Sequence, residues 1–485
     1  MINIKIIYKI LGSLLFIEAI LLFLCFVISL VYSEDDRIAF GIATVLVCAV
    51  GFILKYKGRK AQNHMSRRDG YLIVSSSWIL FTLFGMLPFL ISGHIPSVCD
   101  AFFETMSGFT STGASVVNNL DTFPHALLFW RSFTQWIGGL GIVFFTLAIL
   151  PSIGIGDVKL FAAEATGPRH DKLHPRIRTT AKWIWGIYLF QTLACTGILF
   201  LCGMGLFDSI NHALATTSSG GFSTMPGGIM TWQSPVIEYV LIVFMFLAGI
   251  NYTLLYLFLL KGRVSHMFTD SEFRGYLAIV VSASAFIALF LYFQAGYGVE
   301  QAIRSALFQV VSIQTTTGFC SDNFMMWPSV TWSVLALVMC IGACAGSTCG
   351  GLKSIRFVML CKTAYNEFRH ILHPKAVVPV RINHSIVTSS IERTLISFTV
   401  LFFLLVVLGT ICLKIMGLCY MDAFSVSLSA LSNCGPAIGP SFGSVHTWYA
   451  LPDAGKWLCS FLMLAGRLEI FSLLLPFLPR FWQEN

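Results

Sequence analysis

The sequence predicts an all-α polytopic membrane protein with about ten transmembrane helices and four re-entrant pore half-helices in pseudo-fourfold helix–pore loop–helix (M1-P-M2) repeats. Three observations support this prediction. The 485-residue chain is 56% hydrophobic and only 11% charged, which is too apolar for a soluble fold of this size. Long apolar runs recur over its whole length, and a bilayer core requires roughly 20 apolar residues per helix. Four short polar stretches, each ending in glycine, lie between such runs.

The apolar runs give the expected order of elements and domains. We expect membrane spans at about 10–31, 38–56, 71–92, 126–150, 182–204, 236–260, 276–294, 332–349, 394–416 and 456–478. Two additional N-terminal helices then occupy residues 1–70. They precede four repeats, at 71–158, 159–262, 263–375 (which includes a glycine-rich segment) and 376–485.

Basic residues are distributed asymmetrically among the connecting segments. Segments 55–68, 159–182, 261–274 and 353–393 hold 6, 6, 3 and 7 Lys or Arg, whereas the alternate loops are acidic. Under the positive-inside rule the basic segments and both termini are cytoplasmic, and the four glycine-ending stretches lie on the outer side. Topology and contact with membrane lipid account for the positive charge, so we expect no nucleic-acid partner.

The four glycine-ending stretches predict an ion-selectivity filter folded from one chain. Their glycines follow one another at intervals of 107, 98 and 117 residues. Successive carbonyls that all point one way require conformations with φ > 0, which glycine adopts without steric cost. Rings of such carbonyls replace the hydration shell of a large monovalent cation. The candidate ion-binding residues are Ser111, Thr112, Gly113, Ser218, Ser219, Gly220, Thr316, Thr317, Gly318, Asn433, Cys434 and Gly435.

A short helix is expected before each stretch. Asp100, Asp208, Ser305 and Asp422 stand 12 or 13 residues before the respective glycines and are expected to begin and cap these helices. Thirteen helical residues span about 20 Å, which is too short to cross the membrane. Such a half-helix directs the negative end of its dipole inward at a cation.

The second helix of each repeat carries small residues. In the first two repeats, Gly138, Gly139 and Gly249 are expected to serve close helix packing. The third repeat differs, because its segment 342–351 contains four glycines, and each glycine costs a helix about 1 kcal/mol relative to alanine. We expect that helix to break and form an intramembrane gate, with candidate gating residues Gly342, Gly346, Ser347, Thr348, Gly350, Gly351 and Lys353.

The fourth second helix carries two charged residues in mid-span. A charge at the bilayer centre costs about 2.5–3.5 kcal/mol or more, so each needs a partner or a wet cavity. Arg467 and Glu469 stand two residues apart and therefore face different directions on a helix. We expect Arg467 to face the pore as a barrier to cations, a structural ion pair being the alternative. Glu469 is expected to pair with a basic residue of another helix.

At these positions the chain resembles the TrkH/Ktr/HKT superfamily of potassium uptake proteins, and most closely its TrkH branch, over essentially all of its length. The two additional N-terminal spans look like those of that branch. The motifs that carry the resemblance are Trp130-Arg131-Ser132-Phe133-Thr134-Gln135-Trp136-Ile137-Gly138-Gly139, Ala345-Gly346-Ser347-Thr348, Gly350-Gly351-Leu352-Lys353, Ser432-Asn433-Cys434-Gly435-Pro436 and Gly466-Arg467-Leu468-Glu469.

The resemblance implies uptake of K⁺ across the inner (plasma) membrane through a filter of four glycines, with the glycine-rich segment as a gate that Arg467 helps to close. It also implies a homodimer, a cytosolic TrkA-like nucleotide-binding ring as regulatory partner, and no organic cofactor. Ser219 stands where relatives commonly have Thr, and Cys434 where they have Val. Gly113 favours potassium, since plant relatives with Ser there transport sodium.

One alternative mechanism remains open at this stage, and an enzyme is rejected. An H⁺- or Na⁺-coupled symporter on the same fold would need a carboxylate relay, and only Glu18 and Glu469 lie deep in apolar spans. An enzyme is not expected, because the chain lacks an H-E-x-x-H or G-x-S-x-G motif, and His370 and His373 have no acidic ligands nearby. The fourteen cysteines lie mostly in apolar runs; Cys99, Cys320 and Cys419 on the outer side could form disulfides.

Overall fold

The computed structural model describes residues 2–61, 65–141, 177–262, 264–375, 379–383, 385–444 and 446–483. Regular structure in these ranges is helical, apart from one antiparallel pair of two-residue strands, β1 (Arg381–Ile382) and β2 (Ser385–Ile386). The α-helices are α1 (Ile4–Tyr32), α2 (Arg37–Lys57), α3 (Arg67–Gly85), α4 (Leu87–Ile91), α5 (Val98–Phe109), α6 (His125–Gly139), α9 (Ile177–Leu201), α10 (Leu206–Thr217), α11 (Pro235–Ala248), α12 (Tyr252–Lys261), α13 (Val264–Thr269), α14 (Ser271–Phe293), α15 (Val299–Gln314), α16 (Ser329–Ile341), α17 (Ser354–Leu372), α18 (Ser389–Ile415), α19 (Tyr420–Ser432), α20 (Asp453–Arg467), α21 (Phe471–Leu474) and α22 (Pro479–Trp482).

The membrane spans agree with the sequence prediction. Within the described ranges, six helical segments are long and apolar enough to cross a bilayer: α1, α2, α3 continued by α4, α9, α14 and α18. Two further spans are broken: α11 and α12 meet at 105°, and α20 meets the segment Phe471–Phe477 at 115°. Helix α16 is a shorter apolar helix, and α6 leads into residues outside the described ranges. Each of the ten expected runs thus contains a helix, and the all-α polytopic fold is confirmed.

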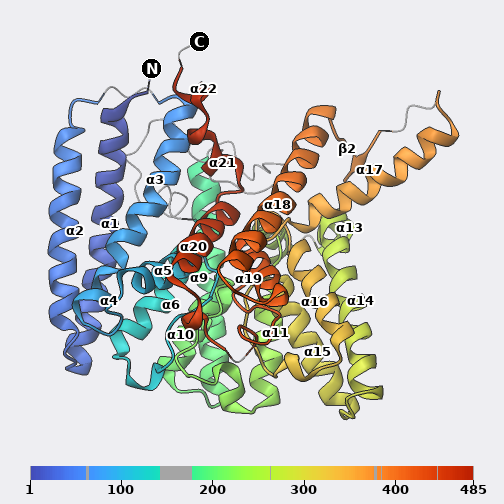
Figure 1. The fold of residues 1–485 in the computed structure, drawn as a ribbon, viewed down its shortest axis with the longest axis horizontal. Coiled ribbons are helices and arrows are strands. Elements are labelled where there is room, and N and C mark those ends of the chain that lie inside the picture. Colours follow the sequence, from blue (N-terminus) through green and yellow to red (C-terminus); the bar gives the residue numbers. More distant parts are fainter. Residues whose placement is uncertain are drawn as a thin grey trace.

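The two N-terminal helices flank the rest of the protein. Helix α1 packs along α2 and also contacts α3 and α6. Figure 1 shows α1, α2 and α3 at one side of the molecule and α14, α15 and α16 at the other. The two chain ends lie at the same end of the molecule, from which α17 and β2 also extend (Figure 1). The chain ends, the far end of α17 and β2 therefore lie toward one face.

Four short helices precede the four polar stretches, as predicted: α5, α10, α15 and α19, of 12, 12, 16 and 13 residues. Their first residues were predicted incorrectly. Ser97 caps α5 and Cys419 caps α19, each accepting the N–H of an aspartate three residues later.

The predicted capping residues lie inside these helices. Asp100, Asp208 and Asp422 are in the first turn, where a carboxylate is still favoured by the positive end of the helix dipole. Helix α15 begins at Val299, six residues before Ser305, and carries Glu300 in its first turn. Aspartate is favoured both at the N-cap and in the first turn of a helix, and these positions are only a few residues apart. The sequence pattern alone therefore does not show which of the two positions an aspartate occupies.

Candidate functional site

Each of the four half-helices ends in the same turn. In α5, the N–H of Ser111 donates to the carbonyl of Gly108 and the N–H of Thr112 to the carbonyl of Ser107, both at 2.9 Å. This pair of bonds is the Schellman motif, in which one residue adopts the left-handed conformation. That residue is usually glycine, yet here all four are polar and non-glycine, with φ between 52° and 56°: Ser111, Ser219, Thr316 and Asn433. Such residues cost of order 1–3 kcal/mol each and concentrate at functional sites.

A glycine with positive φ follows two residues after each of these positions. The φ values are 82° at Gly113, 76° at Gly221, 82° at Gly318 and 96° at Gly435. The second stretch therefore differs from the prediction by one residue, because Gly221 rather than Gly220 corresponds to Gly113. Gly220 instead corresponds to Thr112. The N–H of each donates to the carbonyl of the residue five positions earlier, Ala215 or Ser107, as the Schellman motif requires.

The four turns meet in a closed ring. A Cβ placed on Gly113 would lie 2.0 Å from the carbonyl oxygen of Gly220, in the second stretch. The same contact runs from Gly221 to Thr317, from Gly318 to Cys434 and from Gly435 back to Thr112, at 1.9, 2.2 and 2.5 Å. All four glycines thus face a carbonyl of the next stretch, and any side chain there would collide with backbone. The structure brings together all twelve predicted ion-binding residues, with Gly221 added.

A cavity of about 420 Å³ opens on one side of this ring. All four positive-φ glycines line it, together with the segments that follow them. Its wall includes Arg131, a buried cation, and the thiol-bearing Cys320. A vestibule reached from four repeats and closed at its base by carbonyls is suited to a small cation.

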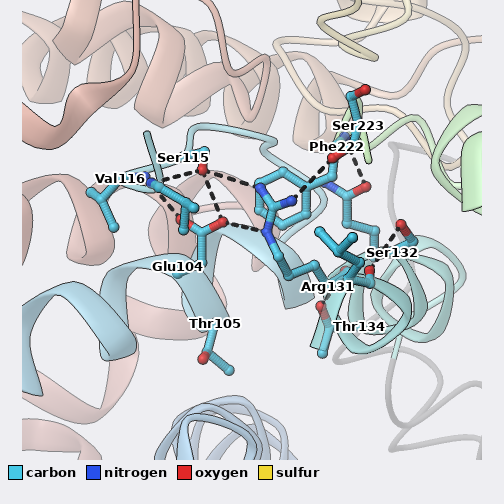
Figure 2. A network of polar contacts seen from close by, with 12 residues as sticks. Glu104, Thr105, Ser115, Val116, Arg131, Ser132, Thr134, Phe222 and Ser223 are labelled. Atoms are coloured by element: carbon cyan, nitrogen blue, oxygen red, sulfur yellow. Dashed lines mark hydrogen bonds and ion pairs between the residues drawn. The ribbon is translucent and has the colours of Figure 1, made fainter. Parts of the chain in front are cut away.

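A buried ion pair links the segments that follow the first and second turns (Figure 2). Arg131 of α6 donates from Nε to Oε1 of Glu104 on α5 at 2.8 Å, and both side chains are almost fully buried. The second carboxylate oxygen accepts the N–H of Val116 at 2.9 Å, just after the first turn. Arg131 also donates to the carbonyl of Ser223, after the second turn, at 3.1 Å, and its guanidinium lies 4.3 Å from the ring of Phe222. One pair therefore connects two neighbouring segments of the ring.

The glycine-rich segment of the third repeat leaves the helix as predicted. Helix α16 ends at Ile341, and Gly342, Gly346, Gly351 and Lys353 all have positive φ. We call residues 342–353 the intramembrane loop. It lies against the inner side of the ring, because its Gly350 N–H donates to Oγ1 of Thr316 at 2.8 Å.

Further contacts fix the intramembrane loop to the ring. The Thr348 hydroxyl donates to the carbonyl of Thr217 at 3.2 Å and accepts from the Ser219 hydroxyl at 3.0 Å. A Cβ on Gly350 would lie 2.1 Å from the carbonyl oxygen of Ser432. The loop thus contacts the second, third and fourth turns. Lys353 is buried at its end and donates from Nζ to the carbonyl of Cys349.

Arg467 connects this loop to the first repeat. Its Nη1 donates to the carbonyl oxygen of Thr348 at 2.7 Å, and its Nη2 donates to the carbonyl of Gly139 at 2.6 Å and to that of Gly138. Glu469, two residues on, pairs with Arg356 of α17. The prediction of a basic partner for Glu469 is confirmed. The hydrogen bonds of Arg467 to Thr348, Gly138 and Gly139 all go to backbone carbonyls, and its guanidinium also lies 5.9 Å from the centre of the Trp78 ring.

Two features were not predicted. The second helix of repeat two also breaks, and its break is held against the intramembrane loop: the N–H of Tyr252 donates to the carbonyl of Gly346 at 3.1 Å, and that of Cys344 to the carbonyl of Gly249 at 3.0 Å. Asn251, which caps α12 within an apolar run, was the available signal. The second feature is the pair of contacts that Gln135 and Arg131, one turn apart on α6, make with the second turn, because the sequence identified these residues only as part of a family motif.

All fourteen cysteines are free, so Cys99, Cys320 and Cys419 form no disulfides in this structure.

Four half-helices that converge on a ring of carbonyls, in a polytopic membrane fold, define a cation-conducting membrane protein as a class. A family model described as TrkH, cation transport protein, matches residues 36–484. The chain is 36% identical over 462 residues to "Trk system potassium uptake protein TrkH" of Escherichia coli K12, covering 94% of this chain and 95% of that protein. It is 34% identical over 484 residues to the protein of the same name from Halomonas elongata, covering 99% and 100%.

A solved structure agrees with these similarities. "Crystal Structure of the Potassium Transporter TrkH from Vibrio parahaemolyticus" matches with a TM-score of 0.89 and 34% sequence identity over 99% of both chains. The chain belongs to the TrkH family of cation transport proteins.

Proposed function

We propose that the chain is the membrane subunit of a potassium uptake system and that K⁺ passes through the ring formed by the four turns. The contacts that close the ring in cyclic order carry this proposal, because they bring carbonyls from four repeats to one axis. The names of the relatives identify potassium as the cargo of those proteins. The filter residues are those predicted from the sequence, with Gly221 in the place first given to Gly220.

The intramembrane loop acts as the gate in this proposal. It lies directly against the ring through its hydrogen bonds with Thr217, Ser219 and Thr316, next to the proposed path of the ion. Arg467 holds it through the Thr348 carbonyl and adds a fixed positive charge below the filter. Movement of the loop must break these hydrogen bonds, so a partner that opens the gate has to supply their free energy.

The remaining assignments follow the family and the charge pattern. We propose the repeat boundaries 71–158, 159–262, 263–375 and 376–485 after the N-terminal unit 1–70. We also propose cytoplasmic termini in the plasma (inner) membrane, a homodimer, and a cytosolic TrkA-like nucleotide-binding ring as partner. The common face of the two termini and α17 supports the orientation (Figure 1).

Uptake of ⁸⁶Rb⁺ into proteoliposomes loaded with KCl, competed by external K⁺ or Na⁺, tests the filter. K⁺ should block wild-type uptake and Na⁺ should not, whereas Gly113→Ser and Gly221→Ser should let Na⁺ compete. Gly203→Ser is the matched control, because Gly203 also has positive φ but nothing lies within 4 Å of its Cβ position. Unchanged selectivity in both ring variants would contradict the proposed path.

A further inference from the structure

The second turn of the ring lacks a side chain that the other three possess. The position directly before the positive-φ glycine is Thr112, Thr317 and Cys434 in three of the repeats, but Gly220 in the second. Two consecutive glycines give this turn the largest backbone freedom of the four. Yet φ at Gly220 is not in the positive range, so its own backbone does not require glycine.

Gln135 of α6 occupies the space that a side chain at position 220 would take. A Cβ placed on Gly220 would lie 2.4 Å from Cδ and 2.6 Å from Oε1 of Gln135. The amide is fully buried, and it makes two hydrogen bonds to the second turn. Its Nε2 donates to the carbonyl oxygen of Gly220 at 2.7 Å, and its Oε1 accepts the N–H of Phe222 at 3.1 Å.

These two bonds hold both peptide groups that flank Gly221. The carbonyl of Gly220 is the one that faces Gly113 in the neighbouring turn of the ring. The direction of this carbonyl therefore decides whether its oxygen can coordinate an ion on the axis of the ring. A carbonyl oxygen has two lone pairs and can accept from Gln135 while it also coordinates a cation. Without the amide, the freedom of two glycines would let this peptide rotate and remove one oxygen from the ring.

The fourth repeat offers an internal comparison. Gly138 and Gly466 make the same contact, each meeting the carbonyl of the residue two before the left-handed position, Phe109 or Leu431. Met463 is therefore the counterpart of Gln135. In agreement, the left-handed residues Ser111 and Asn433 donate to the main-chain carbonyls of Gln135 and Met463, respectively. An amide side chain stands at the first of these two positions and an apolar one at the second.

We propose that Gln135 is a selectivity-determining positioning residue, which replaces the missing filter side chain of the second repeat and fixes the Gly220 carbonyl toward the ion path. This inference rests on the proposed filter. In this inference a residue of the first repeat fixes the backbone geometry of the second turn. The selectivity of the second quarter of the ring therefore depends on the neighbouring first repeat.

The test measures competition of ⁸⁶Rb⁺ uptake by Na⁺ in proteoliposomes. Gln135→Met gives position 135 the residue of its counterpart and removes both hydrogen bonds at similar volume, and it should make Na⁺ about tenfold more effective as a competitor. Gln135→Glu removes the donor to Gly220 and should have a larger effect. Thr410→Val is the control, because Thr410 is a buried residue of α18 whose hydroxyl donates to the carbonyl of Val406 in its own helix.

A second arm tests the contact between positions 135 and 220 by rescue. Gly220→Ala alone should abolish uptake, because its Cβ collides with Gln135. Gln135→Gly combined with Gly220→Ala should recover uptake, since the colliding atoms are gone, and Na⁺ should compete with that uptake as in Gln135→Met, since both hydrogen bonds are lost. Failure of the double variant to exceed Gly220→Ala would overturn the inference.

The outcomes separate the two proposals. If Gly113→Ser relaxes selectivity and Gln135→Met leaves it unchanged in correctly folded protein, Gln135 has no role in selectivity while the filter stands. If neither substitution changes competition by Na⁺, the filter itself is wrong and the inference falls with it.

Discussion

The guanidinium of Arg467 donates a 2.7 Å hydrogen bond to the carbonyl oxygen of Thr348, and this contact joins the broken helix of the fourth repeat to the intramembrane loop of the third. Through Gly138 and Gly139 the same side chain reaches the first repeat. One cation therefore holds three repeats around the inner side of the ring. Its positive charge is compensated there by carbonyl dipoles at the C-terminal end of α6 and in the intramembrane loop.

Substitution of Arg467 should open the path. We expect Arg467→Ala to raise ⁸⁶Rb⁺ flux several-fold in the absence of any partner ring, because both the hydrogen bonds to the loop and the fixed charge are lost. Arg467→Lys should have an intermediate effect, since lysine keeps the charge but not the fork of donors. Arg480→Ala, at an exposed position, is the control. Equal flux in Arg467→Ala and wild type, with and without the partner, would refute this role.

Removal of one partner from the Glu104–Arg131 pair should destabilise the protein strongly. Glu104→Gln or Arg131→Met leaves a buried charge without its partner, which costs about 3–5 kcal/mol. The double variant should cost less than the sum, because no charge remains. Thermal unfolding in detergent measures the effect. Glu300→Gln is the control, since its pair with Arg304 is exposed on the Glu300 side and should shift stability far less.

Asp36, between α1 and α2, predicts a pH dependence of stability. Burial raises the pKa of this carboxyl above its ordinary value of 3.8, although the Ser29 hydroxyl opposes the shift. An acid with a raised pKa favours the folded state at low pH, and this contribution is lost as pH rises from about 3.8 through the folded value. Asp36→Asn should therefore unfold at a higher temperature than wild type at pH 7, and the difference should shrink towards pH 4. A difference independent of pH would contradict the explanation.

Glu18 distinguishes the coupled symporter from the proposed pathway. Its carboxylate is buried in α1, and neither oxygen has a hydrogen-bond partner among the described residues. Oε1 lies 3.4 Å from the Cβ position of Gly85, against the first pore helix. Glu18→Gln keeps the shape without the charge, so we expect unchanged uptake and equal or higher thermal stability. Loss of a pH-dependent component of uptake in this variant alone would favour proton coupling.

The spans, the half-helices and the break in the glycine-rich segment could be predicted because each depends on composition within a short window. The register of the second turn could not. Gly220 and Gly221 are adjacent and either satisfies a motif that ends in glycine, so the choice is made by the hydrogen bond from the Gly220 N–H to Ala215 and by contact with the next repeat. The break after Gly249 was missed for a similar reason. Its flanking sequence is apolar, and the break is stabilised by the intramembrane loop almost a hundred residues later.

The contacts of Gln135 and Arg131 with the second turn could not be predicted from the sequence either. Both residues stand in the second helix of the first repeat, but their contacts are with the second turn. A periodic pattern shows that a polar face exists on α6, whereas the identity of the facing segment depends on the cyclic order of the repeats.

The ring that closes from Gly435 to Thr112 is formed by a single polypeptide chain. Each of its four turns, here called quadrants, therefore has a different sequence. In a channel assembled from four identical subunits, a single codon change alters every quadrant at once. In the filter proposed here a mutation alters one quadrant and leaves three intact, so discrimination between cations can be adjusted in small steps. A serine or cysteine at one position then becomes a graded variation that natural selection can test without loss of the whole pathway.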